Sequence, residues 1–247
     1  MKITVFTPLY NRAHLISNLY ESLKRQQCQR FQWVVVDDGS TDCPEKLFEV
    51  WQKEDNNFEI VFVKQANGGK HRAINNGLKH ARGKYFVICD SDDYLVDDAL
   101  STIETWISET EDLDLIGVAG QKQNQDGELL IWNNSDDSKA HYGGKLFFDD
   151  YVDLTPADSI KQGMYGDKTE VIKTDIFKRY PFPEFEGENF LTEMVVYNRM
   201  SLDNLKLRWY TKPLTVCSYL EDGLTQDSGK FIRNPKGYAL YLIEDPD

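Results

Sequence analysis

The 247-residue sequence has few cysteines, few prolines and no long apolar run, and each shortage excludes a class of protein. Its four cysteines are scattered, without a Cys-x-x-Cys pair or a nearby histidine cluster, so neither a zinc site nor a disulfide framework is indicated. No stretch reaches the roughly 18 apolar residues that a bilayer span requires, and the N-terminus lacks the apolar core of a signal peptide. We therefore expect a globular, cytoplasmic protein without a transmembrane segment.

Positive charge is scarce as well. The chain has 28 lysine and arginine residues against 41 aspartate and glutamate residues, which gives a formal net charge of -13 at pH 7. Because such a chain repels the phosphate backbone of a nucleic acid, we expect no nucleic-acid partner.

The first third of the sequence alternates short β-branched runs with segments of helical spacing. This alternation is typical of βαβ units and of a largely parallel sheet. The predicted strands cover residues 3–7, 33–36, 60–63 and 85–89. The predicted helices cover residues 15–23, 44–51, 73–81 and 100–107.

Beyond residue 93 the pattern becomes less regular. Strands are predicted at 113–118 and 129–132 around an Asp126-Gly127 turn, a helix within 190–202, and extended chain from 205 to 219. We expect long loops between 133 and 166, because that segment is polar and has no clear period. No repeat or linker divides the chain, so the prediction is a single α/β domain over residues 1–247, with a mostly parallel sheet flanked by helices and an irregular C-terminal half.

The strongest chemical signal is an acidic cluster after the fourth predicted strand, made of Asp90, Ser91, Asp92 and Asp93. A divalent cation would relieve the repulsion between these carboxylates, since Mg²⁺ and Mn²⁺ prefer carboxylate and phosphate oxygens. The cluster also lies beyond the carboxyl end of a strand, where ligands bind in open α/β sheets. For an isolated Asp-x-Asp, a solvated acidic turn is the simpler explanation, and the rest of the sequence has to decide.

Two other acidic loops can be compared with this cluster. A calcium-binding EF-hand loop that begins at Asp90 requires glycine at its sixth position, where Leu95 stands, so an EF-hand is excluded. A haloacid-dehalogenase-like phosphohydrolase would use Asp90 as its nucleophile, but that family expects Thr or Val at the position of Tyr94. The phosphohydrolase is kept as the alternative function.

A second acidic cluster follows the strand at 33–36. Asp37 and Asp38 precede a glycine turn, and a carboxylate at this place can accept a hydrogen bond from a nucleotide base or ribose. An ordinary strand-to-helix turn with a capping aspartate explains the same residues equally well.

A glycine loop at residues 67–72 opens the third predicted helix. Its backbone N–H groups, the helix dipole and Lys70 favour a phosphate group. It is not a Walker A loop, because Lys64 stands at the first glycine position and His71 at the Ser/Thr position. A P-loop ATPase is therefore excluded. No Gly-x-Gly-x-x-Gly follows the first strand either, so a dinucleotide-binding protein loses its main support.

Taken in order, four motifs resemble those of the family 2 glycosyltransferases, which have the GT-A fold. The motifs are Thr-Pro-Leu-Tyr-Asn-Arg at 7–12, Val-Asp-Asp-Gly-Ser-Thr-Asp at 36–42, Asn-Gly-Gly at 67–69 with Asn-Asn-Gly at 75–77, and Gly-Lys-Tyr at 83–85 with Asp-Ser-Asp-Asp at 90–93. Four such motifs in this order and at this spacing are hard to obtain by chance. The resemblance is close over residues 1–100.

The resemblance implies an inverting, metal-assisted transfer of a sugar from a nucleoside diphosphate donor, expected to be UDP-linked, to an acceptor hydroxyl in surface polysaccharide or glycan synthesis. The expected cofactor is Mn²⁺ or Mg²⁺, held by Asp92 and bridging the donor's diphosphate. By the same resemblance, Asp38 contacts the base and Asp90 lies near the ribose. The other expected nucleotide-sugar-binding residues are Thr7, Pro8, Tyr10, Asn11, Arg12, Asn67, Lys70 and Ser91.

Inversion by direct displacement also needs a catalytic base that removes the acceptor's proton. The resemblance places this base in a Glu-Asp pair at a helix start, and residues 185–193 are the segment that fits. Glu193 is the first candidate and Glu188 the second. Met194 follows Glu193 where the family has aspartate, and an acid that stabilises the first turn of a helix is the simpler explanation of Glu193.

We expect residues 1–100 to bind the nucleotide sugar and residues 101–247 to bind the acceptor. A glycan or lipid-linked acceptor leaves association with the inner face of a membrane open, although the acidic balance argues against a polybasic anchor. Residues 222–225 could form a flap over the diphosphate or an ordinary glycine turn. A third hypothesis is a non-catalytic nucleotide- or carbohydrate-binding module, in which replacing Glu193 would change nothing measurable.

Overall fold

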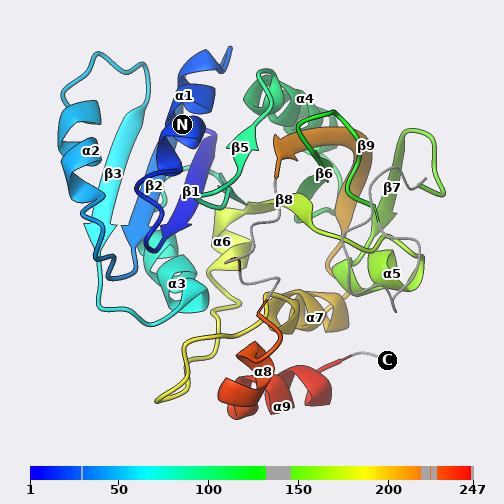
Figure 1. Cartoon of the computed structure of the whole chain (residues 1–247). Helices are drawn as coiled ribbons and strands as arrows, with labels where there is room; N and C mark the ends of the chain where they lie inside the picture. Colours follow the sequence, from blue (N-terminus) through cyan, green and yellow to red (C-terminus); the bar gives the residue numbers. More distant parts are fainter. Residues whose placement is uncertain (29, 132–145, 218–222, 224–226, 246–247) are drawn as a thin grey trace.

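The computed structural model describes residues 1–28, 30–131, 146–217, 223 and 227–245, which form one β-sheet with helices on both faces (Figure 1). Strands follow the order β3-β2-β1-β4-β8-β6-β9-β5, and β7 pairs with β9 beside this path. The predicted α/β fold, a sheet flanked by helices, is confirmed.

The first four strands are parallel to one another. They are β1 (Ile3–Leu9), β2 (Phe31–Asp37), β3 (Glu59–Lys64) and β4 (Tyr85–Ile88). Their apolar runs lack alternation because helices cover both faces of a parallel sheet, and all four were predictable for that reason. The chain runs from β1 through β2 to β3 and then places β4 on the other side of β1. Ligands bind in the crevice that such a reversal creates beyond the strand ends.

The remaining strands pair in both directions. They are β5 (Tyr94–Leu95), β6 (Gly117–Gln123), β7 (Tyr151–Leu154), β8 (Lys168–Lys173) and β9 (Leu207–Val216). Strand β8 is antiparallel to β4 and β6, whereas β9 is parallel to β6 and antiparallel to β5 and β7. The extended chain predicted at 205–219 is confirmed over β9. The strand predicted at 113–118 is misplaced, because β6 continues through the buried polar residues Gln121 and Lys122.

Two further expectations about this half need correction. Of the loops expected between 133 and 166, residues 133–145 lie outside the described part of the chain, and the rest contains β7 and the short helix α5 (Pro156–Lys161). Thr155 caps α5 by accepting a hydrogen bond from the Asp158 N–H. A Thr-Pro helix start is a signal that the polar composition masked. After the Asp126-Gly127 turn, Leu129 makes only an isolated bridge to Gln123, and position 132 lies outside the described residues.

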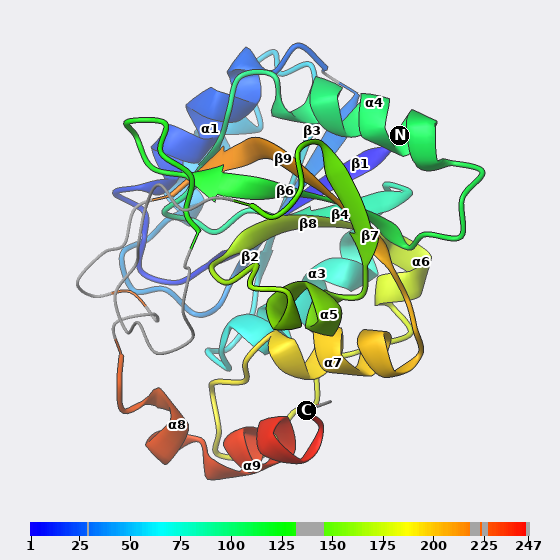
Figure 2. The same ribbon diagram turned by 90° about the vertical axis from the view of Figure 1, so that its right-hand side faces the viewer.

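The helices form two layers, one on each face of the sheet (Figure 2). One layer contains α1 (Ile16–Arg25), α2 (Glu45–Trp51) and α4 (Ala99–Thr110). The other contains α3 (Lys70–His80), α6 (Thr174–Phe177) and α7 (Met194–Leu202). Each layer closes its own apolar core, so the strands between them are rigidly held and fix the positions of the loops at their ends.

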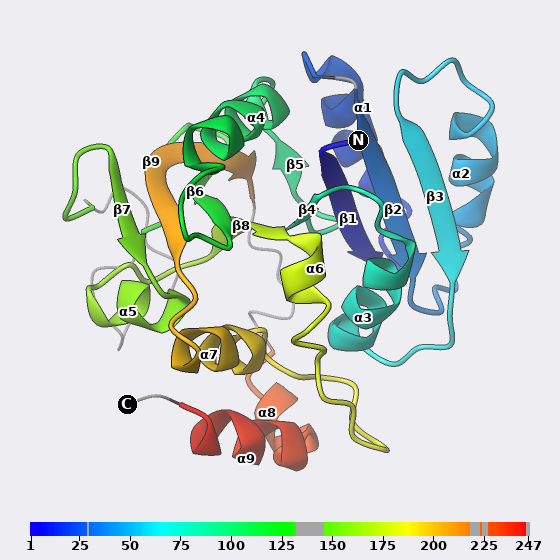
Figure 3. The ribbon, with the colours of Figure 1, turned by 180° about the vertical axis from the view of Figure 1, so that it is seen from behind.

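Two C-terminal helices, α8 (Lys230–Arg233) and α9 (Pro235–Ile243), lie outside α7 as an outer layer (Figure 3). The Arg199 guanidinium on α7 forms a two-pronged ion pair with Glu244 at the end of α9, at 2.7 and 2.8 Å. None of the described helices has the length and apolar character needed to cross a bilayer.

Candidate active site

The candidate site lies where the parallel strands end. Asn11 and Arg12 follow β1, Asp38 follows β2, Gln65 follows β3 and Asp90 follows β4. Because parallel strands end at the same edge of a sheet, residues far apart in the sequence meet there. The motifs predicted from the sequence therefore converge on one edge.

Lys70 is the centre of the charged part of this site. Its Nζ lies 2.7 Å from Oδ1 of Asp90 and 2.8 Å from Oε1 of Glu193. The three side chains come from the first residue of α3, the end of β4 and the residue that precedes α7, and each is between 24% and 35% exposed. Burial opposes the charge on Lys70, but Asp90 and Glu193 outweigh it and raise the pKa of the ammonium. The same balance, with Lys70 and Lys122 outweighing burial, lowers the pKa of Asp90.

The other two aspartates of the acidic cluster have different surroundings. Asp93 is buried and forms a 2.8 Å ion pair with Lys122 of β6, whose pKa is raised by this partner despite burial. Asp92 forms no ion pair within the described part of the chain. Burial, followed by the charge of Asp90, raises the pKa of Asp92. Among the described residues, Asp92 is therefore the carboxylate of the three that has no cationic side chain paired with it.

The glycine loop is held by Asp38, which is 3% exposed. Oδ1 accepts hydrogen bonds from Gln65 Nε2 at 2.8 Å and from the Gly68 N–H at 2.9 Å. Oδ2 accepts from the Gly69 N–H at 2.7 Å and from Asn67 Nδ2 at 3.2 Å. A carboxylate has about four acceptor sites, and all are used here. Asp38 therefore positions the loop, and its expected contact with a nucleotide base stays a prediction.

Gly69 is required at the start of α3 for two reasons. Its φ of 95° lies in the region that side chains rarely adopt, and a Cβ atom would lie 1.8 Å from the carbonyl oxygen of Asn189. The glycine loop thus touches the segment that leads to Glu193. No residue with a side chain fits this contact.

The segment after β1 forms the rim of the site. Asn11 has a φ of 52°, and its Oδ1 accepts a hydrogen bond from the Thr41 N–H at 2.8 Å. Pro8 is half-buried and Tyr10 is 48% exposed, so both remain available to a ligand. Thr7 is fully buried, and its hydroxyl accepts a hydrogen bond from the indole N–H of Trp33 at 3.0 Å. Thr7 lies beneath the site and has no exposed atom for a ligand.

The second candidate base, Glu188, is committed to the fold. Its two carboxylate oxygens accept hydrogen bonds from the Lys236 and Gly237 N–H groups, both at 2.8 Å, at the start of α9. With 6% of its surface exposed, Glu188 caps a helix, as the N-terminal positive end of a helix favours. The structure therefore places Glu193, and not Glu188, beside Lys70 and Asp90.

Arg72 connects the glycine loop with the segment that carries these glutamates. Its guanidinium donates hydrogen bonds to the carbonyl oxygens of Gly68 at 2.8 Å, Glu188 at 2.7 Å and Phe185 at 2.6 Å. These contacts occupy Arg72 as a structural clamp. They leave Lys70 as the cation of this loop that faces the acidic cluster.

Three residues near the site were not predicted from the sequence: Gln65, Lys122 and Glu170. Burial and then the charge of Glu193 raise the pKa of Glu170 on β8 to about 7. Gln65 and Glu170 belong to no motif. Lys122 is a polar residue in a region whose sequence has no clear alternation, so nothing marked it as buried. The position expected for a flap, 222–225, falls outside the described residues except for Gly223.

Comparison with known families identifies the chain. The model of the family described as "Glycosyl transferase family 2" matches residues 4–153, which is more than half of the sequence. The chain belongs to glycosyl transferase family 2. A phosphohydrolase that uses Asp90 as its nucleophile is therefore wrong, and Asp90 instead pairs with Lys70.

Curated glycosyltransferases are similar to between 40% and 52% of the chain. The uncharacterized glycosyltransferase EpsJ of Bacillus subtilis is 34% identical over 129 residues, which are 52% of this chain and 37% of EpsJ. A poly(ribitol-phosphate) beta-glucosyltransferase of Bacillus spizizenii is 33% identical over 40% of this chain and 16% of the relative. A GalNAc(5)-diNAcBac-PP-undecaprenol beta-1,3-glucosyltransferase of Campylobacter jejuni is 30% identical over 41% of this chain and 33% of the relative. The matches thus span less than half the length of these proteins.

Solved structures of glycosyltransferases share the fold over almost the whole chain. Residues 1–349 of Staphylococcus aureus TarS, in complex with UDP-GlcNAc, superpose with a TM-score of 0.71 at 20% identity, covering 99% of this chain and 66% of that TarS fragment. The mannosyltransferase PcManGT of Pyrobaculum calidifontis, in complex with GDP-Man and Mn²⁺, gives a TM-score of 0.62 at 19% identity, covering 98% of this chain and 63% of that one. At these identities the likeness shows the fold.

Proposed function

We propose that the protein transfers a glycosyl unit from a nucleoside diphosphate sugar to an acceptor hydroxyl, with inversion at the anomeric carbon. The observation that carries this proposal is the Lys70 ion pair with Asp90 and Glu193. It brings the glycine loop, the acidic cluster and a carboxylate from the C-terminal half to one point. In a glycosyl transfer, the donor phosphate and the acceptor hydroxyl have to lie on either side of the same anomeric carbon, so groups that bind each of them have to lie close together.

We assign the donor to the side formed by residues 1–100. The half-buried and exposed rim residues Pro8, Tyr10, Asn11 and Arg12 form the base side of the proposed pocket, and Asn67 and Ser91 line its phosphate side. The Gly68 and Gly69 N–H groups are already bound by Asp38, so Lys70 supplies the positive charge for the diphosphate. The donor that we propose is UDP-linked, as in the TarS complex with UDP-GlcNAc.

The metal proposed for this site is Mn²⁺ or Mg²⁺. Lys70 occupies Asp90 and Lys122 occupies Asp93, and within the described residues there is no group of three or more carboxylate, histidine or cysteine side chains suited to a metal. Asp92 fits a cation that takes most of its remaining ligands from the donor's diphosphate and water, as Mg²⁺ commonly does. When bound, such an ion supplies Lewis-acid stabilisation of the leaving diphosphate. Mn²⁺ is present in the PcManGT complex.

Glu193 is the base in this proposal. It accepts the proton of the acceptor hydroxyl while that oxygen forms a bond to the anomeric carbon and the bond from this carbon to the diphosphate oxygen breaks. The nucleoside diphosphate leaves with the electron pair of the broken bond. Lys70 holds the Glu193 side chain toward the acidic cluster, so the base is positioned before the acceptor arrives.

The acceptor side is assigned to residues 101–247. Two relatives are named for polymeric or lipid-linked acceptors, a poly(ribitol-phosphate) and an undecaprenol diphosphate glycan. We therefore propose a glycan or lipid-linked acceptor in surface polysaccharide synthesis.

The test combines thermal unfolding with turnover. UDP with Mn²⁺ should raise the unfolding temperature, since a ligand that binds the native state stabilises it, and Asp92→Ala should remove most of this shift. Glu193→Gln should keep the shift but lose transfer from UDP-sugars to acceptors. A Glu193→Gln variant with unchanged turnover would place the base elsewhere, and a wild-type protein that binds nucleotide without any transfer or donor hydrolysis would support the non-catalytic module.

A further inference from the structure

Helix α9 has an apolar face that points away from the protein. Its inward side consists of buried Gly237 and of half-buried Leu240 and Tyr241, and these last two pack against the apolar core of the layer that contains α3, α6 and α7. Helical spacing places Tyr238 beside Leu242 and Ala239 beside Ile243 on the opposite side. The outward exposures of the large residues are 39% for Tyr238, 55% for Leu242 and 78% for Ile243. A helix that is apolar all round is normally buried on all sides.

The short helix α8 extends this surface. Ile232 is 84% exposed, the highest value among the large hydrophobic side chains of the described residues. Eleven such side chains are exposed in total, and four of them fall within the twelve residues from 232 to 243. Exposed hydrophobic residues are usually scattered singly, so this concentration marks a contact surface. We call Ile232, Tyr238, Leu242 and Ile243 the α8–α9 face.

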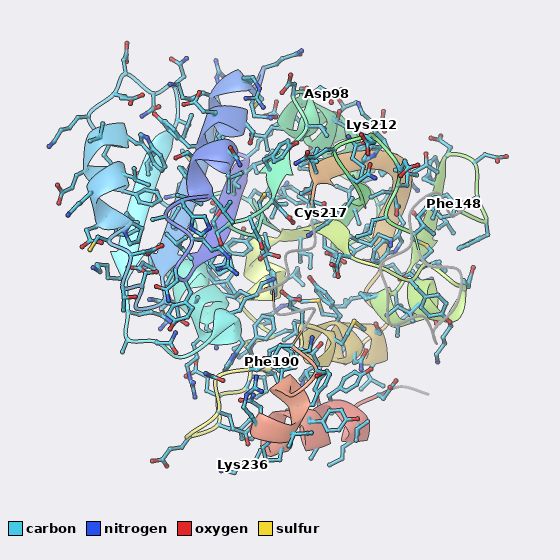
Figure 4. All side chains as sticks on the ribbon, viewed as in Figure 1. Asp98, Phe148, Phe190, Lys212, Cys217 and Lys236 are labelled. Atoms are coloured by element: carbon cyan, nitrogen blue, oxygen red, sulfur yellow. The ribbon has the colours of Figure 1, made fainter. Side chains whose placement is uncertain are left out.

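The charged residues within the segment that carries the α8–α9 face are all positive, although the whole chain carries -13. Between 229 and 243 the sequence contains Lys230, Arg233 and Lys236 and no acidic residue. Of the flanking acids, Asp227 pairs with Arg233 and Glu244 pairs with Arg199, while Asp245 lies just beyond the end of α9. Lys236 is exposed and lies at the outer edge of the molecule, below Phe190 (Figure 4).

Cations interleaved with exposed leucine, isoleucine and tyrosine are the combination that binds the surface of an anionic bilayer. A second copy of the chain fits less well, because a two-fold interface would bring each copy's Lys236 and Lys230 near those of its partner. We propose that the α8–α9 face rests on the surface of an anionic lipid membrane. The helices lie flat in the headgroup region and do not span the bilayer.

This surface adjoins the proposed active site. Asn234, between α8 and α9, accepts hydrogen bonds from the Asn189 and Phe190 N–H groups at 2.8 and 3.0 Å. A cavity of about 470 Å³ reaches from Gly68 of the glycine loop to Arg233 of α8. If the proposed function holds, the membrane would lie beside the acceptor side of the site, which suits a lipid-linked acceptor. The membrane contact itself does not depend on that function.

The experiment is co-sedimentation of the full chain with vesicles of phosphatidylcholine and phosphatidylglycerol in equal parts, and with vesicles of phosphatidylcholine alone. The wild type should bind the mixed vesicles and lose most of this binding in the neutral vesicles or at high salt. Leu242→Ser combined with Ile243→Ser, and separately Lys236→Glu, should each weaken binding about tenfold. Val50→Ser is the matched control, since Val50 is 57% exposed on α2 and should leave binding unchanged.

Unfolding temperatures and donor hydrolysis of the same variants separate a lost surface from a lost fold or a lost active site. Binding that is equal in wild type and in the Leu242→Ser, Ile243→Ser variant would overturn the proposal. So would a wild-type dimer in sedimentation velocity that this variant turns into a monomer, because the face would then join two copies. A wild type that sediments with neither kind of vesicle would refute it as well.

Discussion

The ion pair of Lys70 with Asp90 and Glu193 allows a quantitative test. The two carboxylate oxygens lie 2.7 and 2.8 Å from the same nitrogen, so they are no more than about 5.5 Å apart. Without the ammonium, two negative charges at this separation repel by about 1 kcal/mol in water and by about 3 kcal/mol at an effective dielectric constant of 20. Because the side chains are partly exposed, we expect Lys70→Met to lower the free energy of unfolding by about 2 kcal/mol.

A double-mutant cycle isolates this repulsion. In Lys70→Met, the further change Glu193→Gln removes one of the two charges and should restore at least about 1 kcal/mol. The same Glu193→Gln change in the wild type removes an attraction to Lys70 and should be neutral or slightly destabilising. Urea unfolding of the four proteins in the presence of EDTA measures all of these values without interference from bound metal.

A matched control uses the same substitution at an exposed ion pair. Lys84 lies 2.8 Å from Glu111, and both side chains are more than half exposed. Lys84→Met should leave the unfolding midpoint nearly unchanged, because water and salt screen such a pair. A coupling below about 0.3 kcal/mol between Lys70 and Glu193 would refute the reasoning, since distant residues add to within that margin.

Three further predictions concern residues around the site. Glu170→Gln should raise the free energy of unfolding by up to about 3 kcal/mol above pH 7 and not at all below pH 4. The Glu170 pKa of about 7 in the folded protein makes the wild type lose stability between about pH 4.5 and 7, where the carboxyl ionises only in the unfolded chain. Urea unfolding at several pH values tests this, and a gain that is the same at every pH would contradict it. Glu188→Ala should cost about 1–2 kcal/mol in urea unfolding by uncapping α9 but retain the UDP-dependent thermal shift, and a large loss of nucleotide binding would instead place Glu188 in the pocket. Gly69→Ala should abolish the UDP-dependent thermal shift, because the added Cβ collides with the Asn189 carbonyl, and an unchanged shift would mean that the loop can move apart at little cost.

The parallel half of the fold was predictable because its signals are local. The unbroken apolar runs of β1, β2 and β4, and the proline before α2, each depend on a few neighbouring residues. The antiparallel half is different, since β6 and β8 gain their burial from partners distant in the sequence. Lys122 and Glu170 look like surface residues until these strands meet beside Asp93 and Glu193.

The residues of the site were predictable from the sequence, but the contacts between them were not. The motifs and the family resemblance identified Asp38, Lys70, Asp90 and Glu193 as candidates, and the structure brings the last three into one ion-pair group. The sequence could not reveal that the carboxylate oxygens of Asp38 are all occupied by donors of the glycine loop and Gln65. That depends on where β2 and β3 end relative to each other. The sequence ranked Glu193 above Glu188, but it could not reveal that Glu193 faces Lys70 while Glu188 faces the start of α9.

The Arg72 clamp has a consequence for how members of this fold can be recombined. The Arg72 guanidinium donates to the main-chain oxygens of Phe185 and Glu188 and pairs with the Glu184 side chain, so this contact between residues before 100 and residues after 180 depends largely on backbone shape. A chimera in which the C-terminal half comes from another enzyme would keep the Arg72 hydrogen bonds wherever the new segment places carbonyl oxygens at the same positions. The donor preference and the acceptor preference could then be exchanged separately, by replacing one half of the chain at a time.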